Sequence, residues 1–150
     1  MEVLFVCKGN VGRSQMAEAI FNSLADGKAT ASSAGVKVGD YEGKTIADIG
    51  PVVVECMRDI NIDISRNTPK ALTKEMFDHA DIVVSMVENR DLLPEYVRSS
   101  GKVLFWDIEN PKLMGHESTA KVRDAIYRYV SALVEQIRSR SIKKARHSYK

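Results

Sequence analysis

The segment of this chain best suited to chemistry is a short loop that combines a thiol, two glycines, an arginine and a hydroxyl. It reads Cys7-Lys8-Gly9-Asn10-Val11-Gly12-Arg13-Ser14. A thiolate is a strong nucleophile, and a planar guanidinium can grip two oxygens of a phosphate at once. Glycines let the backbone fold around such an anion. The loop therefore predicts a site for a tetrahedral oxyanion, with Cys7 as nucleophile and Arg13 as anion ligand.

The elements on either side would position this loop. Val3–Val6 is a short apolar run typical of a buried parallel strand, and apolar residues recur at helical spacing from Met16 to Leu24. Loops that follow parallel strands are where such sheets bind ligands. The helix N-terminus adds unpaired N–H groups and a partial positive charge, which favour both an anion and a thiolate. We expect Ser14 to assist the thiolate as a leaving group.

Both cysteines also have a purely structural interpretation. A cysteine that ends an apolar strand is often a small core residue, so for Cys7 the catalytic interpretation depends on the glycines, Arg13 and Ser14 together. Cys56 lies in an apolar helical stretch, and we expect it to pack in the core. Two cysteines this far apart form no disulfide framework and no metal-binding pair.

Predicted strands and helices alternate along the rest of the chain, which indicates a parallel sheet covered on both faces. The further strands are expected at 29–36, 81–86 and 103–106, and helical segments at 49–60, 72–77, 92–97 and from Ser118 onward. We place one domain at 1–138. The basic segment 139–150 is expected to be a flexible tail, with docking to an acidic partner or nucleic acid as its alternative role.

Composition narrows the function classes. The chain has 150 residues with 22 basic and 20 acidic side chains, so the domain as a whole offers no electrostatic case for nucleic acid. The N-terminal apolar run is too short for a membrane span and has no basic leader. Free thiols suit a reducing compartment, so we expect a cytoplasmic protein without membrane, nucleic-acid or metal partners.

Several motifs together resemble the low-molecular-weight protein tyrosine phosphatases and the thioredoxin-linked arsenate reductases that share their fold. They are Val3-Leu4-Phe5-Val6-Cys7, Gly9-Asn10, Arg13-Ser14, Ala17-Glu18, Ser33-Ala34-Gly35, Asp63-Ile64-Ser65-Arg66, Ala80-Asp81 and Val83-Val84. The resemblance implies a three-layer α/β/α fold with a four-stranded parallel sheet and a phosphate-binding loop after the first strand. It implies two-step hydrolysis through a cysteinyl phosphate without metal or cofactor. Substrates would be phosphorylated proteins or small aryl phosphates, and phosphate or other oxyanions would bind as product or inhibitor.

The resemblance also assigns roles to individual residues. Loop residues 8–14 would bind phosphate, while Asn10, Ser14 and Ser33 would hydrogen-bond the loop into shape. An aromatic slot would be walled by Tyr41, Pro111 and Leu113, although Tyr41 could equally be an exposed loop aromatic. Val11 is apolar as in tyrosine-directed members, whereas members directed at phosphoarginine have a threonine there.

Two departures leave alternatives open. Gly12 stands where many members carry a second, protective cysteine, and Asn110 stands before Pro111, where the family's general acid is an aspartate. An amide cannot donate that proton, so Glu109 or Asp107 would have to substitute, and Asp107 could instead only stabilise its loop. The alternatives to a phosphatase are an arsenate reductase of the same fold, or an acid-deficient protein that binds phosphate or phosphopeptides.

Overall fold

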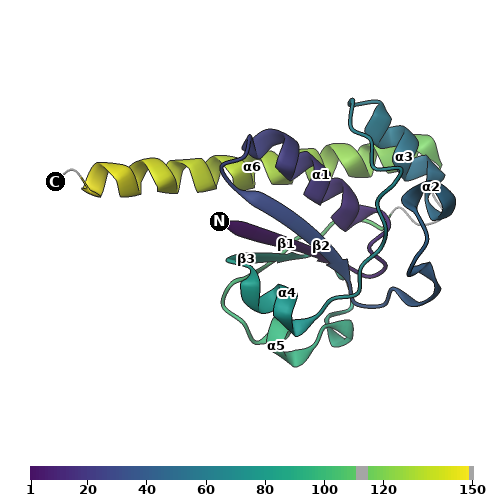
Figure 1. The fold of residues 1–150 in the computed structure, drawn as a ribbon, viewed down its shortest axis with the longest axis horizontal. Helices are drawn as coiled ribbons and strands as arrows, with labels where there is room; N and C mark the ends of the chain where they lie inside the picture. Colours follow the sequence, from purple (N-terminus) through teal and green to yellow (C-terminus); the bar gives the residue numbers. More distant parts are fainter. Residues whose placement is uncertain (111–114, 149–150) are drawn as a thin grey trace.

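The computed structural model describes residues 1–110 and 115–148 as an α/β domain built around one sheet (Figure 1). Its elements in chain order are β1 (Glu2–Cys7), α1 (Arg13–Ala25), β2 (Thr30–Gly35), the 3-10 turn η1 (Gly39–Tyr41), α2 (Ile46–Ile49), α3 (Pro51–Arg58), α4 (Lys74–His79), β3 (Ile82–Ser85), the 3-10 turn η2 (Arg90–Leu92), α5 (Glu95–Arg98), β4 (Val103–Phe105) and α6 (His116–Ser148).

The four strands are parallel and lie in the order β2-β1-β3-β4, which confirms the predicted sheet. β1 is the central strand that the loop follows, and it pairs with β2 on one side and β3 on the other. Its last residue, Cys7, lies opposite Gly35 of β2, while Val6 lies opposite Ser85 of β3. The loop therefore begins where the carboxyl ends of three strands meet.

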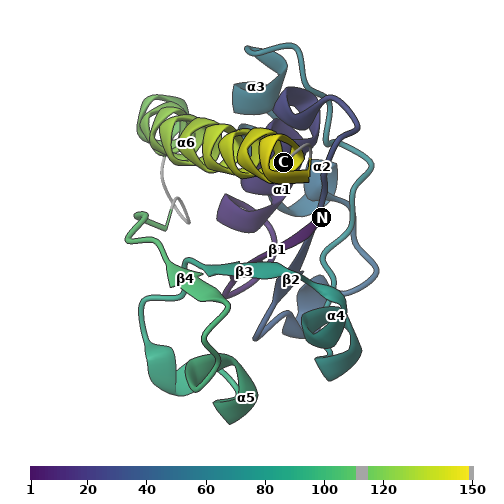
Figure 2. The same cartoon turned by 90° about the vertical axis from the view of Figure 1, so that its left-hand side faces the viewer.

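Helices cover both faces of the sheet, as the alternating pattern predicts (Figure 2). Side chains of β1 alternate between the two cores, since successive residues of a strand point to opposite faces. Phe5 packs in the core formed with α1, α3 and α6, and Leu4 packs in the smaller core formed with α4 and α5. Every β1 side chain after Glu2 is buried, so the strand that ends at Cys7 is fixed on all sides.

The helix expected at 49–60 is present as α3, while Ile49 belongs to the preceding α2 and Gly50 separates the two. A Cβ at Gly50 would lie 2.9 Å from Val11 Cγ1, so a larger residue there would require the Val11 side chain to shift. Pro51 then starts α3, where its missing N–H and fixed φ suit the first turn.

The last helix is longer than the sequence suggested. α6 begins at His116 rather than at Ser118, and it continues to Ser148, beyond the position 138 at which we ended the domain. Figure 1 shows its C-terminal part projecting past the sheet. The division into a domain and a flexible basic tail stays a prediction. Among the described helices, none is long and apolar enough to cross a membrane.

Candidate active site

The side chain of Asn10 holds the loop between β1 and α1 in shape. Asn10 is fully buried and has a left-handed backbone with φ of 56°, which asparagine tolerates better than most residues. Its Nδ2 donates to Ser14 Oγ at 2.7 Å and to Ser33 Oγ at 3.0 Å. Its Oδ1 accepts from Gln15 Nε2 at 3.1 Å and from Lys70 N at 2.8 Å. One amide thus ties the loop to α1, to β2 and to the segment before α4.

The sulfur of Cys7 lies at the centre of this loop. It is 2.8 Å from Ser14 Oγ, and the backbone N–H of Asn10 points at it from 3.3 Å. Because the Asn10 amide can only donate, Ser14 Oγ accepts that bond and its own hydrogen is available to the sulfur. Two donors therefore face Cys7 Sγ, an arrangement that stabilises a thiolate.

Arg13, the first residue of α1, is buried and is held by one edge of its guanidinium. Its NH1 donates to Met86 O and Ile108 O and forms an ion pair with Glu88 Oε1 at 2.6 Å. All contacts that Arg13 makes with described residues use NH1, which leaves Nε and NH2 for an anion. Glu88 was not predicted as a site residue, since nothing in its local sequence relates it to Arg13.

A cavity of about 710 Å³ opens beside the loop. Cys7 and Gly12 are among its lining residues, and much of the rest of the lining is apolar. The apolar lining residues are Val11, Val38, Tyr41, Ile49, Pro51, Val52 and Val53. A Cβ at Gly9 would lie 3.4 Å from Tyr41 Cε2, so the Tyr41 ring packs over the loop. Tyr41 thus lies on the cavity wall, as expected. Pro111 and Leu113, expected on the same slot, lie outside the described residues.

Gly35 allows the end of β2 to pack directly on the loop backbone. A Cβ there would lie 2.8 Å from Lys8 O and 2.9 Å from the carbonyl carbon of Gly9, closer than real Cβ contacts. The chain continues alongside, with Val36 N donating to Cys7 O at 3.1 Å. Gly35 belongs to the Ser33-Ala34-Gly35 motif, but the sequence does not reveal its packing role, because this requirement comes from a tertiary contact.

The three candidates for the proton donor occupy different places. Asn110 is half-buried and lines the cavity that contains Cys7. Asp107 lines a separate cavity of about 280 Å³ together with Glu88, and Glu109 is exposed and lines neither. Of these three described residues, only Asn110 therefore lines the cavity that contains Cys7. Buried Ile108 fixes the stretch by accepting the bond from Arg13.

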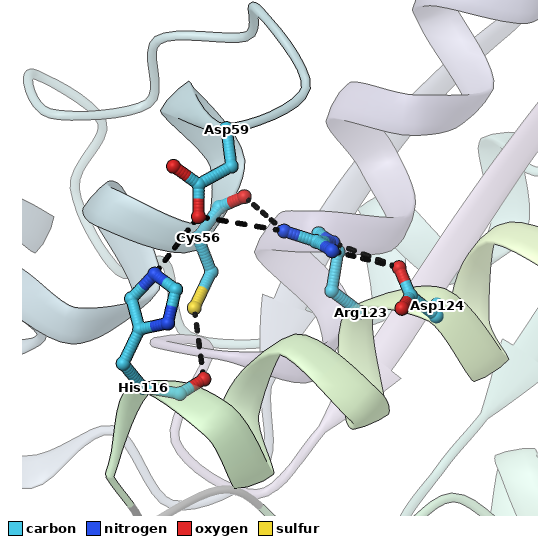
Figure 3. A network of polar contacts seen from close by, with 5 residues as sticks. All are labelled: Cys56, Asp59, His116, Arg123 and Asp124. Atoms are coloured by element: carbon cyan, nitrogen blue, oxygen red, sulfur yellow. Dashed lines mark hydrogen bonds and ion pairs between the residues drawn. The ribbon is translucent and has the colours of Figure 1, made fainter.

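Cys56 faces α6 instead of the cavity (Figure 3). Its Sγ contacts His116 O at 3.5 Å, and its own carbonyl accepts from Arg123 NH1 at 2.8 Å. Asp59 completes the network, with its Oδ2 2.8 Å from His116 Nε2 and 3.8 Å from Arg123 NH1. Burial raises the pKa of the Cys56 thiol, and the Arg123 charge opposes this only in part. Cys56 is thus a buried packing residue, as its sequence context predicts.

No group of three or more His, Cys, Asp or Glu side chains in the described part of the chain is arranged to hold a metal ion. The Arg13 guanidinium contacts Met86, Glu88 and Ile108, while the structure brings together the side chains of Cys7 and Ser14 at the loop. Asn10 and Ser33 support them, and Gln15 extends this support by accepting from Asn67 at 3.2 Å through its own amide oxygen. Gln15 was not predicted as a site residue because a single glutamine in a helix carries no distinctive signal.

Comparison with known proteins places these features in a family. Residues 2–144 match the family described as low molecular weight phosphotyrosine protein phosphatase. A glutaredoxin arsenate reductase from Synechocystis sp. is 30% identical over 139 residues, covering 91% of this chain and 98% of that protein. The low molecular weight protein tyrosine phosphatase of T. tengcongensis is 32% identical with a TM-score of 0.80, covering 91% of this chain and 99% of the other. The YwlE arginine phosphatase, in a mutant with a phosphorylated active-site serine, is 26% identical with a TM-score of 0.79, covering 92% and 96%.

Proposed function

Because this chain belongs to the low molecular weight phosphotyrosine protein phosphatase family, we propose that it hydrolyses phosphotyrosine-type phosphomonoesters through a cysteinyl phosphate on Cys7. The observation that carries the proposal is the 2.8 Å contact between Cys7 Sγ and Ser14 Oγ inside a loop built for an anion. Free thiols at both cysteines suit a reducing compartment, and we propose the cytoplasm.

In the first step the Cys7 thiolate attacks phosphorus in line with the ester oxygen. The P–O bond breaks, its electron pair goes to the leaving oxygen, and a P–S bond forms. The free edge of Arg13 and the backbone N–H groups of the loop would hold the three non-bridging oxygens, where charge is stabilised without reorganisation. The NH1 edge is already held by protein, so the guanidinium is oriented before the substrate arrives.

In the second step a water molecule attacks phosphorus and the P–S bond breaks. The electron pair returns to sulfur, the water gives its proton to the carboxylate that served as acid in the first step, and inorganic phosphate leaves. Ser14 assists by donating its hydrogen bond to the departing thiolate, while the Asn10 amide holds the Ser14 oxygen from the other side. Ser14→Ala should therefore slow hydrolysis of the intermediate more than its formation. A burst of aryl alcohol followed by slow turnover is the expected result in stopped-flow measurements.

The lining of the cavity supports an aromatic phosphate ester over phosphoarginine. Tyr41, Val11 and Val53 provide apolar surface for a ring, whereas a guanidinium would need a carboxylate in reach. Asp40 is the one acidic side chain among the described residues of the lining, and it is exposed. We expect kcat/KM for phosphotyrosine to exceed that for phosphoarginine. The reverse order would refute this substrate assignment.

For the proton donor we propose Glu109, the carboxylate adjacent to Asn110 in sequence, with Asp107 as the less favoured candidate. Phosphorylation rates measured against leaving-group pKa provide the test, because a general acid makes this dependence shallow. Glu109→Gln should steepen it, and Asp107→Asn should leave it unchanged. If neither change affects the dependence on leaving-group pKa, while Asn110→Asp raises the phosphorylation rate with basic leaving groups, the protein lacks a dedicated general acid.

Arsenate reduction is the second candidate, because relatives such as the Synechocystis protein carry that name. Reducing arsenate to arsenite takes two electrons, which Cys7 and a second thiol would supply by forming a disulfide. Apart from Cys7 this chain has only Cys56, which is buried against α6. We expect no arsenate turnover coupled to thioredoxin or glutaredoxin. Such turnover in the wild type, lost in Cys56→Ala, would establish the reductase instead.

A further inference from the structure

Two lysines at the rim of the cavity have charges that the fold does not neutralise. Lys8 and Lys37 both line the cavity and both side chains are exposed. Lys37 N donates to Lys8 O at 2.8 Å, so the backbone holds the two residues side by side. Neither ammonium group has an ion-pair or hydrogen-bond partner among the side chains and backbone described at 1–110 and 115–140. A peptide that enters the cavity therefore meets two available cations.

The rim is more basic than the molecule as a whole. The complete chain has a formal net charge of +2 from 22 basic and 20 acidic side chains. At this single opening the two lysines outnumber Asp40, the one carboxylate among the described lining residues. Asp40 precedes Tyr41 in η1, whereas Lys8 and Lys37 follow the ends of β1 and β2. The basic side of the rim is therefore built on the two strand ends nearest the nucleophile.

We propose that Lys8 and Lys37 select phosphorylated segments that carry acidic residues beside the phosphotyrosine. The inference rests on the proposed phosphatase activity and adds a preference for the surrounding sequence. When the phosphate lies against Cys7 and the ring against Tyr41, the flanking residues of a peptide must pass over the rim. Charges within about 10 Å interact there at 0.1 M salt, a range that shrinks to about 3 Å at 1 M.

Exposed ion pairs are individually weak, which sets the size of the expected effect. Each contributes about a 1.4-fold to fivefold change in binding. Two phosphotyrosine peptides that differ only in glutamate or glutamine beside the phosphotyrosine should thus differ by roughly twofold to 25-fold in kcat/KM at low salt when both lysines act. The preference should shrink as salt is raised, because the lysines are exposed.

The test compares this acidic-to-neutral ratio in the wild type, Lys37→Glu and Lys28→Glu. The ratio cancels any effect that a substitution has on both peptides alike. Lys37→Glu places a carboxylate at the rim and should lower the ratio to about one or below. Lys28 is exposed and precedes β2, at the opposite end of that strand from Lys37, so Lys28→Glu makes the same charge change outside the reach of the rim. That control should keep the wild-type ratio.

The outcomes separate this inference from the proposed function. Equal ratios in wild type and Lys37→Glu, or an equal shift in Lys28→Glu, would overturn the role of the rim. The role of the rim would also be overturned if the wild type hydrolyses p-nitrophenyl phosphate but has the same kcat/KM for both peptides. This result would not contradict the phosphatase assignment. A wild type that fails to hydrolyse p-nitrophenyl phosphate would overturn the proposed function and the inference with it.

Discussion

Replacing Asn10 with alanine should destabilise the protein and slow catalysis together. The change removes four hydrogen bonds, and each contributes about 1 kcal/mol net. Alanine also fits the left-handed backbone at φ of 56° less well, at a further cost of roughly 1 kcal/mol. In the variant Ser14 keeps its contact with Cys7 and Ser33 keeps its bond to Glu18. These remaining contacts make the total loss of stability smaller than the sum of the separate contributions. We expect a loss of about 3 to 5 kcal/mol in the free energy of unfolding.

Asn61→Ala separates the two contributions. Asn61 has a left-handed φ of 63° and is exposed, and its side chain makes no hydrogen bond to any described residue. It should lose only the backbone contribution of about 1 kcal/mol. Urea unfolding of both variants gives the difference, which measures the hydrogen-bond network alone. Turnover of an aryl phosphate, measured where each variant is fully folded, should fall at least tenfold in Asn10→Ala and stay unchanged in Asn61→Ala.

The reasoning is refuted if the two variants are destabilised equally, because the Asn10 amide would then contribute nothing beyond its backbone conformation. It is also refuted if Asn10→Ala loses stability but retains full turnover. In that case Ser14 would not depend on Asn10 for its orientation toward Cys7.

Three further changes test other parts of the site. Cys7→Ser should abolish turnover yet keep vanadate binding measurable, since Arg13 and backbone N–H groups hold the anion; turnover above a tenth of the wild-type rate would exclude the covalent route. Gly35→Ala should cost about 1 to 3 kcal/mol through overpacking against Lys8 O, whereas Gly101→Ala, which meets no atom within 4 Å, should cost far less in the same unfolding assay. Because burial raises the pKa of Cys56, its thiol should resist iodoacetamide at neutral pH and react faster as pH rises, with Cys7 alkylated first. Intact mass and peptide mapping measure alkylation at both sites. A Cys7–Cys56 disulfide after mild peroxide treatment would contradict the buried position of Cys56.

The fold was largely predictable because its signals are local. The apolar run of β1 and the helical spacing after it each indicate one element, and their alternation implies parallel strands. The helix predicted at 49–60 is present as α3 (Pro51–Arg58), but its start is shifted because Ile49 ends α2 and Gly50 separates the two helices. The close approach of Gly50 to Val11 is a tertiary contact that no pattern within the stretch records.

The residues of the candidate site likewise fall into those that local sequence indicates and those that depend on tertiary contacts. The loop from Cys7 to Ser14 is contiguous, so its residue types alone indicated an anion site. Glu88, Gln15 and the packing role of Gly35 depend on segments that meet only in the fold. The proton donor is the hardest part, because the sequence offers Asp107 and Glu109 while the structure places Asn110 at the cavity. Neighbouring positions that differ in exposure cannot be ranked from residue type.

The position of β1 between β2 and β3 has a consequence for how the molecule opens. Backbone groups of β1 are hydrogen-bonded on both sides and buried, so amide hydrogens there should exchange only through global unfolding. β4 pairs with β3 alone, is three residues long and exposes Leu104 and Phe105. The segment that it leads into, with the candidate acids, should exchange through local opening. The two halves of the active site would then belong to different cooperative units. In mild denaturant the phosphorylation rate with basic leaving groups should fall before the affinity for phosphate does.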